Sequence, residues 1–107
     1  MFRHVVLMTW TKATTGEQIA SVVDGLRALP GQVAAIRGFS FGEDAGVSPG
    51  NADLAVVADF DDERGYREYA GHPAHMRLVD ERIKPILAAR TAVQYDATPL
   101  PPAVRSV

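Results

Sequence analysis

Four short segments of the chain have the hydrophobic pattern of β-strands. The first is apolar on both of its alternating faces and carries His4, Val6 and Met8 on one of them. Such a strand needs cover on both sides of its sheet, and a second subunit is the obvious candidate for one side. The predicted strands are residues 4–10, 36–42, 54–60 and 91–96.

A helical pattern first appears between the first two predicted strands. Thr14 and Glu17 fit a capping box, with Thr14 as the N-cap. Apolar residues then recur at helical spacing, which gives the helix one apolar face for the sheet. We expect Pro30-Gly31 to end this helix.

Two further helices are predicted on either side of Gly71-His72-Pro73. Asp61 or Asp62 can cap the first of them, which carries two tyrosines. Proline suits the first position of the second helix, because its missing N–H has no partner there. The inner side of this second helix would carry His75, Leu78, Val79, Ile83 and Ile86.

The resulting order of elements is β-α-β-β-α-α-β, which predicts an α+β ferredoxin-like fold. In this fold a four-stranded antiparallel sheet has helices on one face. The other face would be open in a monomer, so two sheets closing into a dimer is the economical arrangement. Three prolines after residue 97 indicate an extended C-terminal tail.

Composition narrows the range of partners and locations. The net charge of −2 supplies no basic stripe for nucleic acid or an anionic membrane. There are no cysteines, which excludes disulfides and thiolate chemistry. No apolar run approaches the roughly 20 residues that span a bilayer. With no leader pattern at the start, we expect a soluble, cytoplasmic protein.

The candidate chemistry lies around the break between the last two helices. His75 would lie in the first turn of its helix, where the helix dipole favours the neutral imidazole. A neutral imidazole can act as a general base, and the Tyr69 hydroxyl could donate to a developing oxyanion. His4 lies on the strand face that could look into the same cavity.

Each of these residues also has a purely structural interpretation. His72 fits a helix N-cap, Tyr69 could simply pack its ring, and His4 could be a satisfied core histidine. A metal site at His72 and His75 is not expected, because no neighbouring carboxylate completes a ligand set. No cofactor-binding motif is present either.

Several short motifs follow one another along the chain in a specific order and spacing. They are His4-Val5-Val6-Leu7, Leu26-Arg27-Ala28-Leu29-Pro30-Gly31, Ile36-Arg37-Gly38-Phe39, Asp59-Phe60, the run from Tyr69 through His72-Pro73-Ala74-His75, and Val93-Gln94-Tyr95-Asp96. Together these motifs resemble the Dabb family, the stress-responsive dimeric α/β-barrel domain. The resemblance covers a domain of residues 1–97 and leaves residues 98–107 as a proline-rich tail.

The resemblance implies a homodimer, a dimeric α+β barrel, with a pocket between sheet and helices in each subunit. In a catalytic relative, the plant olivetolic acid cyclase, the residues matching His75 and Tyr69 are the base and its supporting tyrosine. Val22 and Ile86 match larger aromatic residues of that enzyme, so the pocket would differ in shape. The pocket residues expected here are His4, Val6, Met8, Val22, Val56, Leu78 and Ile86.

Three functions remain open at this point. The first is a stress-associated homodimer that binds a small apolar ligand without turnover. The second is a cofactor-independent cyclase-like enzyme acting on a polyketide-like ligand by aldol condensation, with His75 as base and Tyr69 as oxyanion donor. The third, by analogy of fold alone, is a cofactorless monooxygenase.

Overall fold

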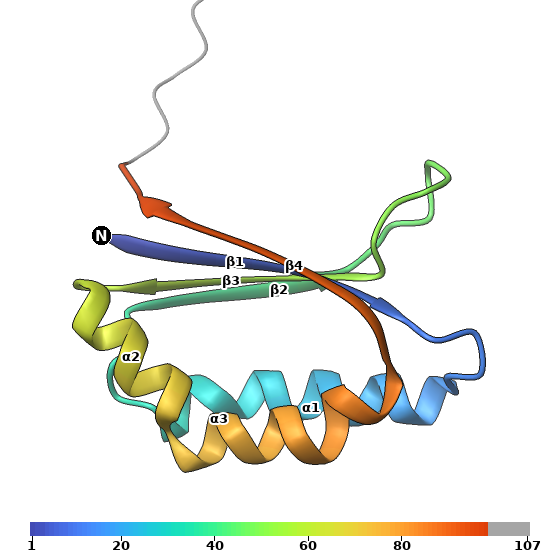
Figure 1. The fold of residues 1–107 in the computed structure, drawn as a ribbon, viewed down its shortest axis with the longest axis horizontal. Coiled ribbons are helices and arrows are strands. Elements are labelled where there is room, and N and C mark those ends of the chain that lie inside the picture. The colour runs from blue at the N-terminus through green and yellow to red at the C-terminus, as the bar shows by residue number, and fades with distance from the viewer. Residues whose placement is uncertain (99–107) are drawn as a thin grey trace, which may run out of the picture.

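The structure is a computed structural model that describes residues 1–98. It confirms the predicted order of elements (Figure 1). The proline-rich tail, apart from Thr98, lies outside the described residues. The elements are β1 (Phe2–Trp10), α1 (Gly16–Gln32), β2 (Gly38–Glu43), β3 (Leu54–Phe60), α2 (Glu63–Gly71), α3 (Pro73–Leu78), the π-helical segment η1 (Val79–Ile83), the 3-10 segment η2 (Lys84–Ile86) and β4 (Leu87–Asp96).

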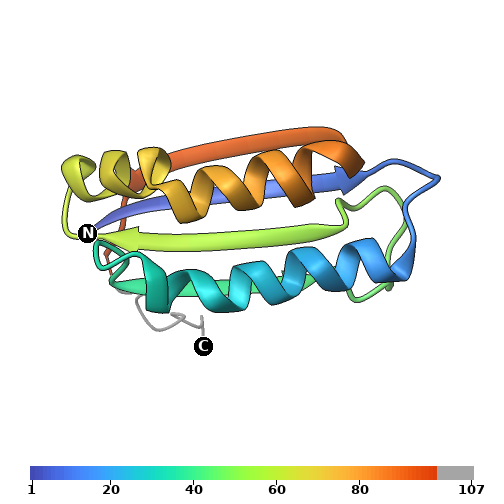
Figure 2. The same cartoon turned by 90° about the horizontal axis from the view of Figure 1, so that it is seen from below.

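The four strands form one antiparallel sheet in the order β2-β3-β1-β4. All helices lie on the same face of this sheet, as expected (Figures 1 and 2). Residues directly opposite one another on neighbouring strands share a face. His4 is opposite Ala58 on β3 and Gln94 on β4, so all three belong to the helix-covered face, which we call the inner face.

The N-terminus of α1 begins one residue later than predicted. Thr15, not Thr14, is the N-cap, and its hydroxyl accepts from the Gln18 backbone N–H at 3.2 Å. The Gln18 side chain accepts from the Thr15 backbone N–H at 2.9 Å, which completes the capping box. Two overlapping boxes are possible in this sequence, and the hydroxyl of Thr14 is instead within 2.9 Å of that of Thr11.

The predicted end of α1 and the predicted start of β4 were also wrong. Pro30 lies inside the helix, which continues to Gln32. Pro30 cannot donate its own helical hydrogen bond, but the Val33 backbone N–H still donates to the Leu29 carbonyl at 3.0 Å, which continues the helical bonding past the proline. β4 begins at Leu87 rather than Thr91, because the third helix tightens into a 3-10 turn around Pro85 and ends there.

The N-cap predictions for the other two helices are confirmed. Asp62 accepts from the Gly65 backbone N–H at 3.0 Å and caps α2. His72 caps α3, with Pro73 at its start. A Cβ at Gly25 would collide with Leu78, so this glycine lets α1 and α3 approach closely over the sheet.

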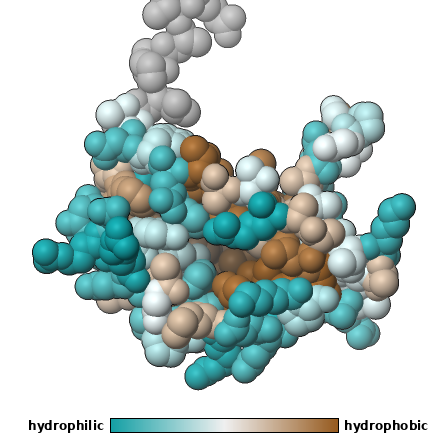
Figure 3. Space-filling model, viewed as in Figure 1, coloured by the Kyte–Doolittle hydropathy of each residue, from teal (hydrophilic) through white to brown (hydrophobic). Residues whose placement is uncertain are grey.

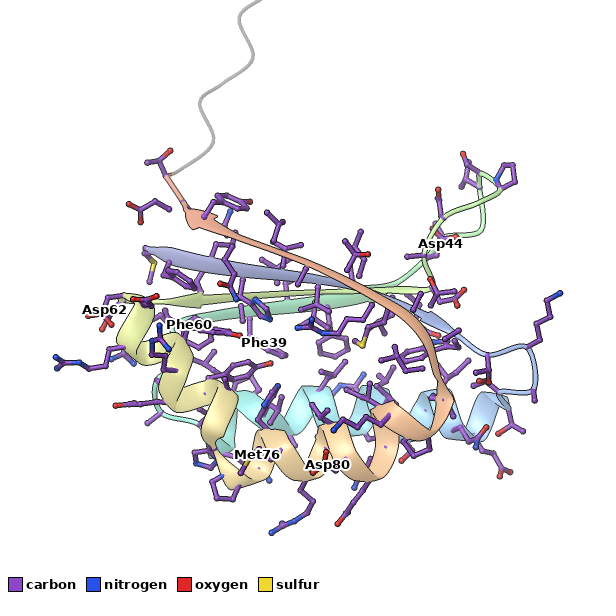
Figure 4. All side chains as sticks on the ribbon, viewed as in Figure 1. Phe39, Asp44, Phe60, Asp62, Met76 and Asp80 are labelled. Carbon is purple, nitrogen blue, oxygen red and sulfur yellow. The ribbon has the colours of Figure 1, made fainter. Side chains whose placement is uncertain are left out.

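The core lies between the sheet and the helices. Phe39 and Phe60 point from the sheet toward the helix layer, whereas Met76 and Asp80 lie on its outer side (Figure 4). The residues of the core are Val6, Met8, Trp10, Val22, Leu26, Leu29, Val33, Leu54, Val56, Ala58, Phe60, Tyr69, Leu78, Ile83 and Ile86.

The opposite face of the sheet, which we call the outer face, has no cover from residues 1–98 (Figure 1). It carries Leu7 and Val93, of which 43% and 56% is exposed. Arg3 and Asp59 form an ion pair there, with the guanidinium Nε 2.7 Å from the carboxylate. Among the described residues, no helix is long and apolar enough to cross a membrane.

Candidate functional site

A cavity of about 290 Å³ lies between the inner face of the sheet and the helices. Figure 3 shows hydrophobic residues gathered between these two layers, with polar residues around them. This volume is near the lower end of small-molecule sites, which begin at about 300 Å³. The residues that line the cavity are His4, Val6, Met8, Leu26, Leu29, Val56, Tyr66, Tyr69, His75, Leu78, Val79, Ile83, Lys84, Leu87 and Arg90.

His75 lies in the first turn of α3, with its ring held by the preceding helix. Its Nδ1 is 3.1 Å from the Ala70 carbonyl oxygen. A carbonyl can only accept, so Nδ1 carries the proton and Nε2 is the unprotonated nitrogen of the neutral ring. Burial lowers the pKa of His75, and the nearby Arg90 and His72 lower it further, against the effect of the Ala70 carbonyl. The ring is therefore a neutral base in the cavity.

Tyr69 is buried at the end of α2 and packs against His75. The centroids of the two rings are 4.2 Å apart. Burial raises the pKa of Tyr69 to about 12, so the phenol stays protonated and can donate a hydrogen bond. Tyr69 lines the cavity, so its phenol can meet a ligand there.

His4 is the one polar residue of the buried part of β1, with 4% of its surface exposed. Its Nδ1 is 3.0 Å from Nε2 of Gln94, which donates to it. The His4 ring lies 4.8 Å from that of Tyr66, between centroids. Burial, with smaller effects of Arg90 and His75, lowers the pKa of His4 to about 4. His4 is therefore also neutral near pH 7.

His72 has a structural place outside the cavity. Its Nδ1 accepts from the Ala74 backbone N–H at 3.0 Å, as the side chain of an N-cap does. It is not among the residues that line the cavity. Across residues 1–98, no three histidine, aspartate or glutamate side chains lie close enough together to hold a metal ion.

The structure brings most of the predicted site residues together. His75, Tyr69 and His4 line one cavity, together with Val6, Met8, Val56 and Leu78. Val22 and Ile86 do not line it. They are buried in the core beside it, with 0% and 2% of their surface exposed.

Two cations in the cavity lining, Lys84 and Arg90, are absent from the sequence-based prediction. Lys84 follows a π-helical segment, which changes the side of the helix on which later residues lie. Arg90 was missed because β4 begins earlier than predicted. The β1–β4 ladder has a register shift between Thr9 and Trp10, and beyond this shift Arg90 pairs with Met8, which places it on the inner face.

These residues together define a ferredoxin-like α+β protein with a largely apolar cavity. A neutral imidazole, a neutral phenol and an arginine are among the groups that line it. The sequence pattern of the Stress responsive A/B Barrel Domain (Dabb) matches residues 2–97. The chain belongs to the Dabb family. None of the curated proteins compared with this chain matches it.

Several solved structures are similar to this chain. A dimeric ferredoxin-like protein of unknown function from Thermobifida fusca is 40% identical over 90% of each chain, with a TM-score of 0.83. One from Bacteroides fragilis is 24% identical over 90% of this chain and 95% of the other, with a TM-score of 0.77. A hydroxynitrile lyase from Passiflora edulis is 15% identical over 94% and 96%, with a TM-score of 0.80.

Proposed function

We propose that this protein is a homodimer in which each subunit binds a small, mainly apolar molecule in the cavity beneath the sheet. The cavity carries this proposal: its wall is apolar apart from a few polar groups that could orient a ligand, which is the usual composition of a small-molecule site.

The dimer follows from the composition of the outer face. Leu7, Val93 and Tyr95 each expose more than two-fifths of their surface there. A contiguous apolar sheet face is unusual on a monomer and typical of an interface. The relative that is 40% identical is described as dimeric, which supports the same assembly here. Light scattering after size-exclusion chromatography tests it, and a stable monomer would contradict it.

A ¹⁹F NMR titration with 4-fluorobenzyl alcohol tests the cavity. We expect saturable binding that is lost when Val56→Phe or Val79→Phe fills the cavity from the sheet or from the helix side. Val47→Phe, in an exposed loop, is the control and should bind normally. Equal binding by all four proteins would place the ligand elsewhere and contradict the proposal.

A second candidate function is proton transfer on the bound molecule, and the tautomer of His75 favours it. Nε2 of His75 would take a proton from a carbon next to a carbonyl, and the electron pair of that C–H bond would move onto the carbonyl oxygen. Tyr69 would donate a hydrogen bond to this enolate oxygen. In the cyclase-like reaction the enolate carbon then attacks a second carbonyl, whose oxygen recovers the proton. A hydroxynitrile lyase has the same fold, so this scaffold can carry an enzyme.

Exchange of the acidic protons of acetylacetone in D2O tests this step without knowledge of the natural substrate. His75→Gln should abolish the protein-catalysed exchange, and His72→Gln, outside the cavity, should retain it. The rate should increase with pD until His75 is neutral, with the midpoint below the ordinary histidine value because the pKa of His75 is lowered. Equal rates for both variants would contradict the role of His75. The oxygenase hypothesis stays a prediction, because no arrangement of the described residues favours it.

A further inference from the structure

The charges around the cavity differ from those of the whole chain. The protein has a net charge of −2, yet the cavity lining contains two cations and no aspartate or glutamate. A cation beside a small-molecule cavity, with no acid facing it, is a natural partner for an anionic group of a ligand.

The two cations are not equivalent. The Lys84 ammonium is 3.0 Å from the Asp80 carboxylate, so its charge is already partnered. Arg90 has no carboxylate within 4.0 Å among residues 1–98, in contrast to Arg3, Arg37 and Arg67. The arginine is therefore the cation that remains available to a ligand.

Its position in the sheet directs Arg90 toward the cavity. It is paired with Met8 across the regular part of the β1–β4 ladder, on the face that holds His4. A surface arginine that only aids solubility would be expected on the outer face or on the outer side of a helix. The positive charge of Arg90 also acts on His4, Tyr69 and His75, since it lowers the pKa of all three.

We propose that the cavity selects ligands that carry a carboxylate, with the carboxylate bound by Arg90 and the apolar remainder lying toward Tyr69 and His75. This specificity rests on the proposed small-molecule function and names the class of ligand. A guanidinium can bind a carboxylate through two parallel N–H···O bonds, which fixes the orientation of the ligand as well as adding affinity. The carboxylate would then hold the reactive carbon of the ligand away from the arginine and near the imidazole.

Binding of 4-fluorobenzoate and 4-fluorobenzamide, measured by ¹⁹F NMR, tests this specificity, because the two probes differ in charge and hardly in shape. We expect the wild-type dimer to bind the benzoate at least tenfold more tightly. Arg90→Gln should remove this preference and leave the affinity for the benzamide unchanged. Arg90→Lys should keep part of it, because the charge remains without the two-pronged geometry. A higher salt concentration should weaken the binding of the benzoate and leave the binding of the benzamide unchanged.

Two variants with the same loss of charge serve as controls. Arg77→Gln lies on an exposed part of α3 outside the cavity and should keep the full preference. Lys84→Gln should keep most of it, because that ammonium is paired with Asp80. Circular dichroism of each variant confirms that it is folded.

The failure of this proposal can be separated from the failure of the proposed function. If neither probe binds, the small-molecule function itself is wrong. Equal affinity for both probes, unaffected by Arg90→Gln, would overturn only the carboxylate specificity. A preference lost in Lys84→Gln but kept in Arg90→Gln would also overturn it, since the lysine would then be the anion-binding residue.

Discussion

Adjacent residues of β1 meet opposite surroundings. Val6 and Met8 are buried beneath the helices, whereas 43% of Leu7, between them, is exposed. The inner face is covered by the chain itself and includes His4 and the cavity. The outer face carries apolar side chains such as Leu7 and Val93 beside the Arg3–Asp59 ion pair, and residues 1–98 leave it uncovered. We therefore propose that one face binds a ligand and that the other binds a second copy of the chain.

The largest expected effect on stability comes from disturbing the packing of the inner face. Phe60 is fully buried beside Tyr66 and Tyr69, with ring centroids 5.9 and 5.2 Å away. Phe60→Ala should lower the free energy of unfolding by about 4 kcal/mol, measured in urea, because it leaves a cavity in a packed core. Val47→Ala, in an exposed loop, should change it by less than about 0.5 kcal/mol. A loss below about 1.5 kcal/mol for Phe60→Ala would show that this core is not packed as described.

The buried histidine of the inner face should make the protein sensitive to acid. The pKa of His4 is about 4 in the folded protein, against an ordinary value of 6.5. The unfolded chain therefore takes up the proton first as the pH falls. The stability contributed by neutral His4 is fully present above pH 6.5 and is lost between pH 6.5 and about 4, by up to roughly 3 kcal/mol.

His4→Gln tests this dependence, because glutamine keeps a polar group beside Gln94 and cannot be protonated. Urea unfolding across this pH range should show a smaller loss for the variant than for wild type, although His75 still contributes in the same direction. The carboxylate of Asp59, whose pKa is lowered mainly by its hydrogen bond to Arg3, acts below pH 3.8 and does not interfere. The same loss in both proteins would contradict the role of His4.

A charge on the outer face should weaken the dimer and leave the fold of each subunit in place. Leu7→Lys should raise the dimer dissociation constant about 100-fold, which corresponds to about 2.7 kcal/mol. Two like charges would then be buried at the interface of the symmetric dimer. Sedimentation equilibrium measures this change. Val47→Lys adds the same charge away from the sheet and should leave the constant as in wild type. An unchanged dissociation constant for Leu7→Lys would show that the outer face is not the dimer interface.

The smallest expected effect concerns the helix that covers the inner face. His72→Ala removes the side chain that caps α3 and should cost about 1 kcal/mol of stability. His72→Asn should restore most of this loss, since asparagine is a good N-cap. Thermal denaturation of the three proteins measures it. Equal thermal stability of the wild type and His72→Ala would mean that Pro73 alone is sufficient to start the helix.

The fold was predictable because its signals are local. Strand alternation, the Asp62 and His72 caps and the prolines define the elements, and their order limits the topology. The errors occurred where two local solutions are nearly equivalent. Thr14 and Thr15 both begin a possible capping box, and the sequence pattern does not distinguish between them.

The site was predictable only in part. His75, Tyr69 and His4 are rare side chains next to clear structural breaks, so their elements place them in one region. Arg90 lies just before the predicted strand and next to the register shift of the β1–β4 ladder, and a shift by one position reverses the face of every side chain. The side of the helix on which Lys84 lies depends on the extra residue in the π-helical segment. The hydrophobic pattern gives no signal for that extra residue.

The most direct test of the account is to ask which face of the sheet a bound molecule contacts. Methyl groups on the two faces can be distinguished by NMR in protein with ¹³C-labelled valine, leucine and methionine methyls. With 4-fluorobenzyl alcohol bound, we predict intermolecular NOEs to Val6, Met8 and Val56 and none to Leu7 or Val93. NOEs confined to Leu7 and Val93 would place the ligand on the outer face and contradict the division of roles between the two faces.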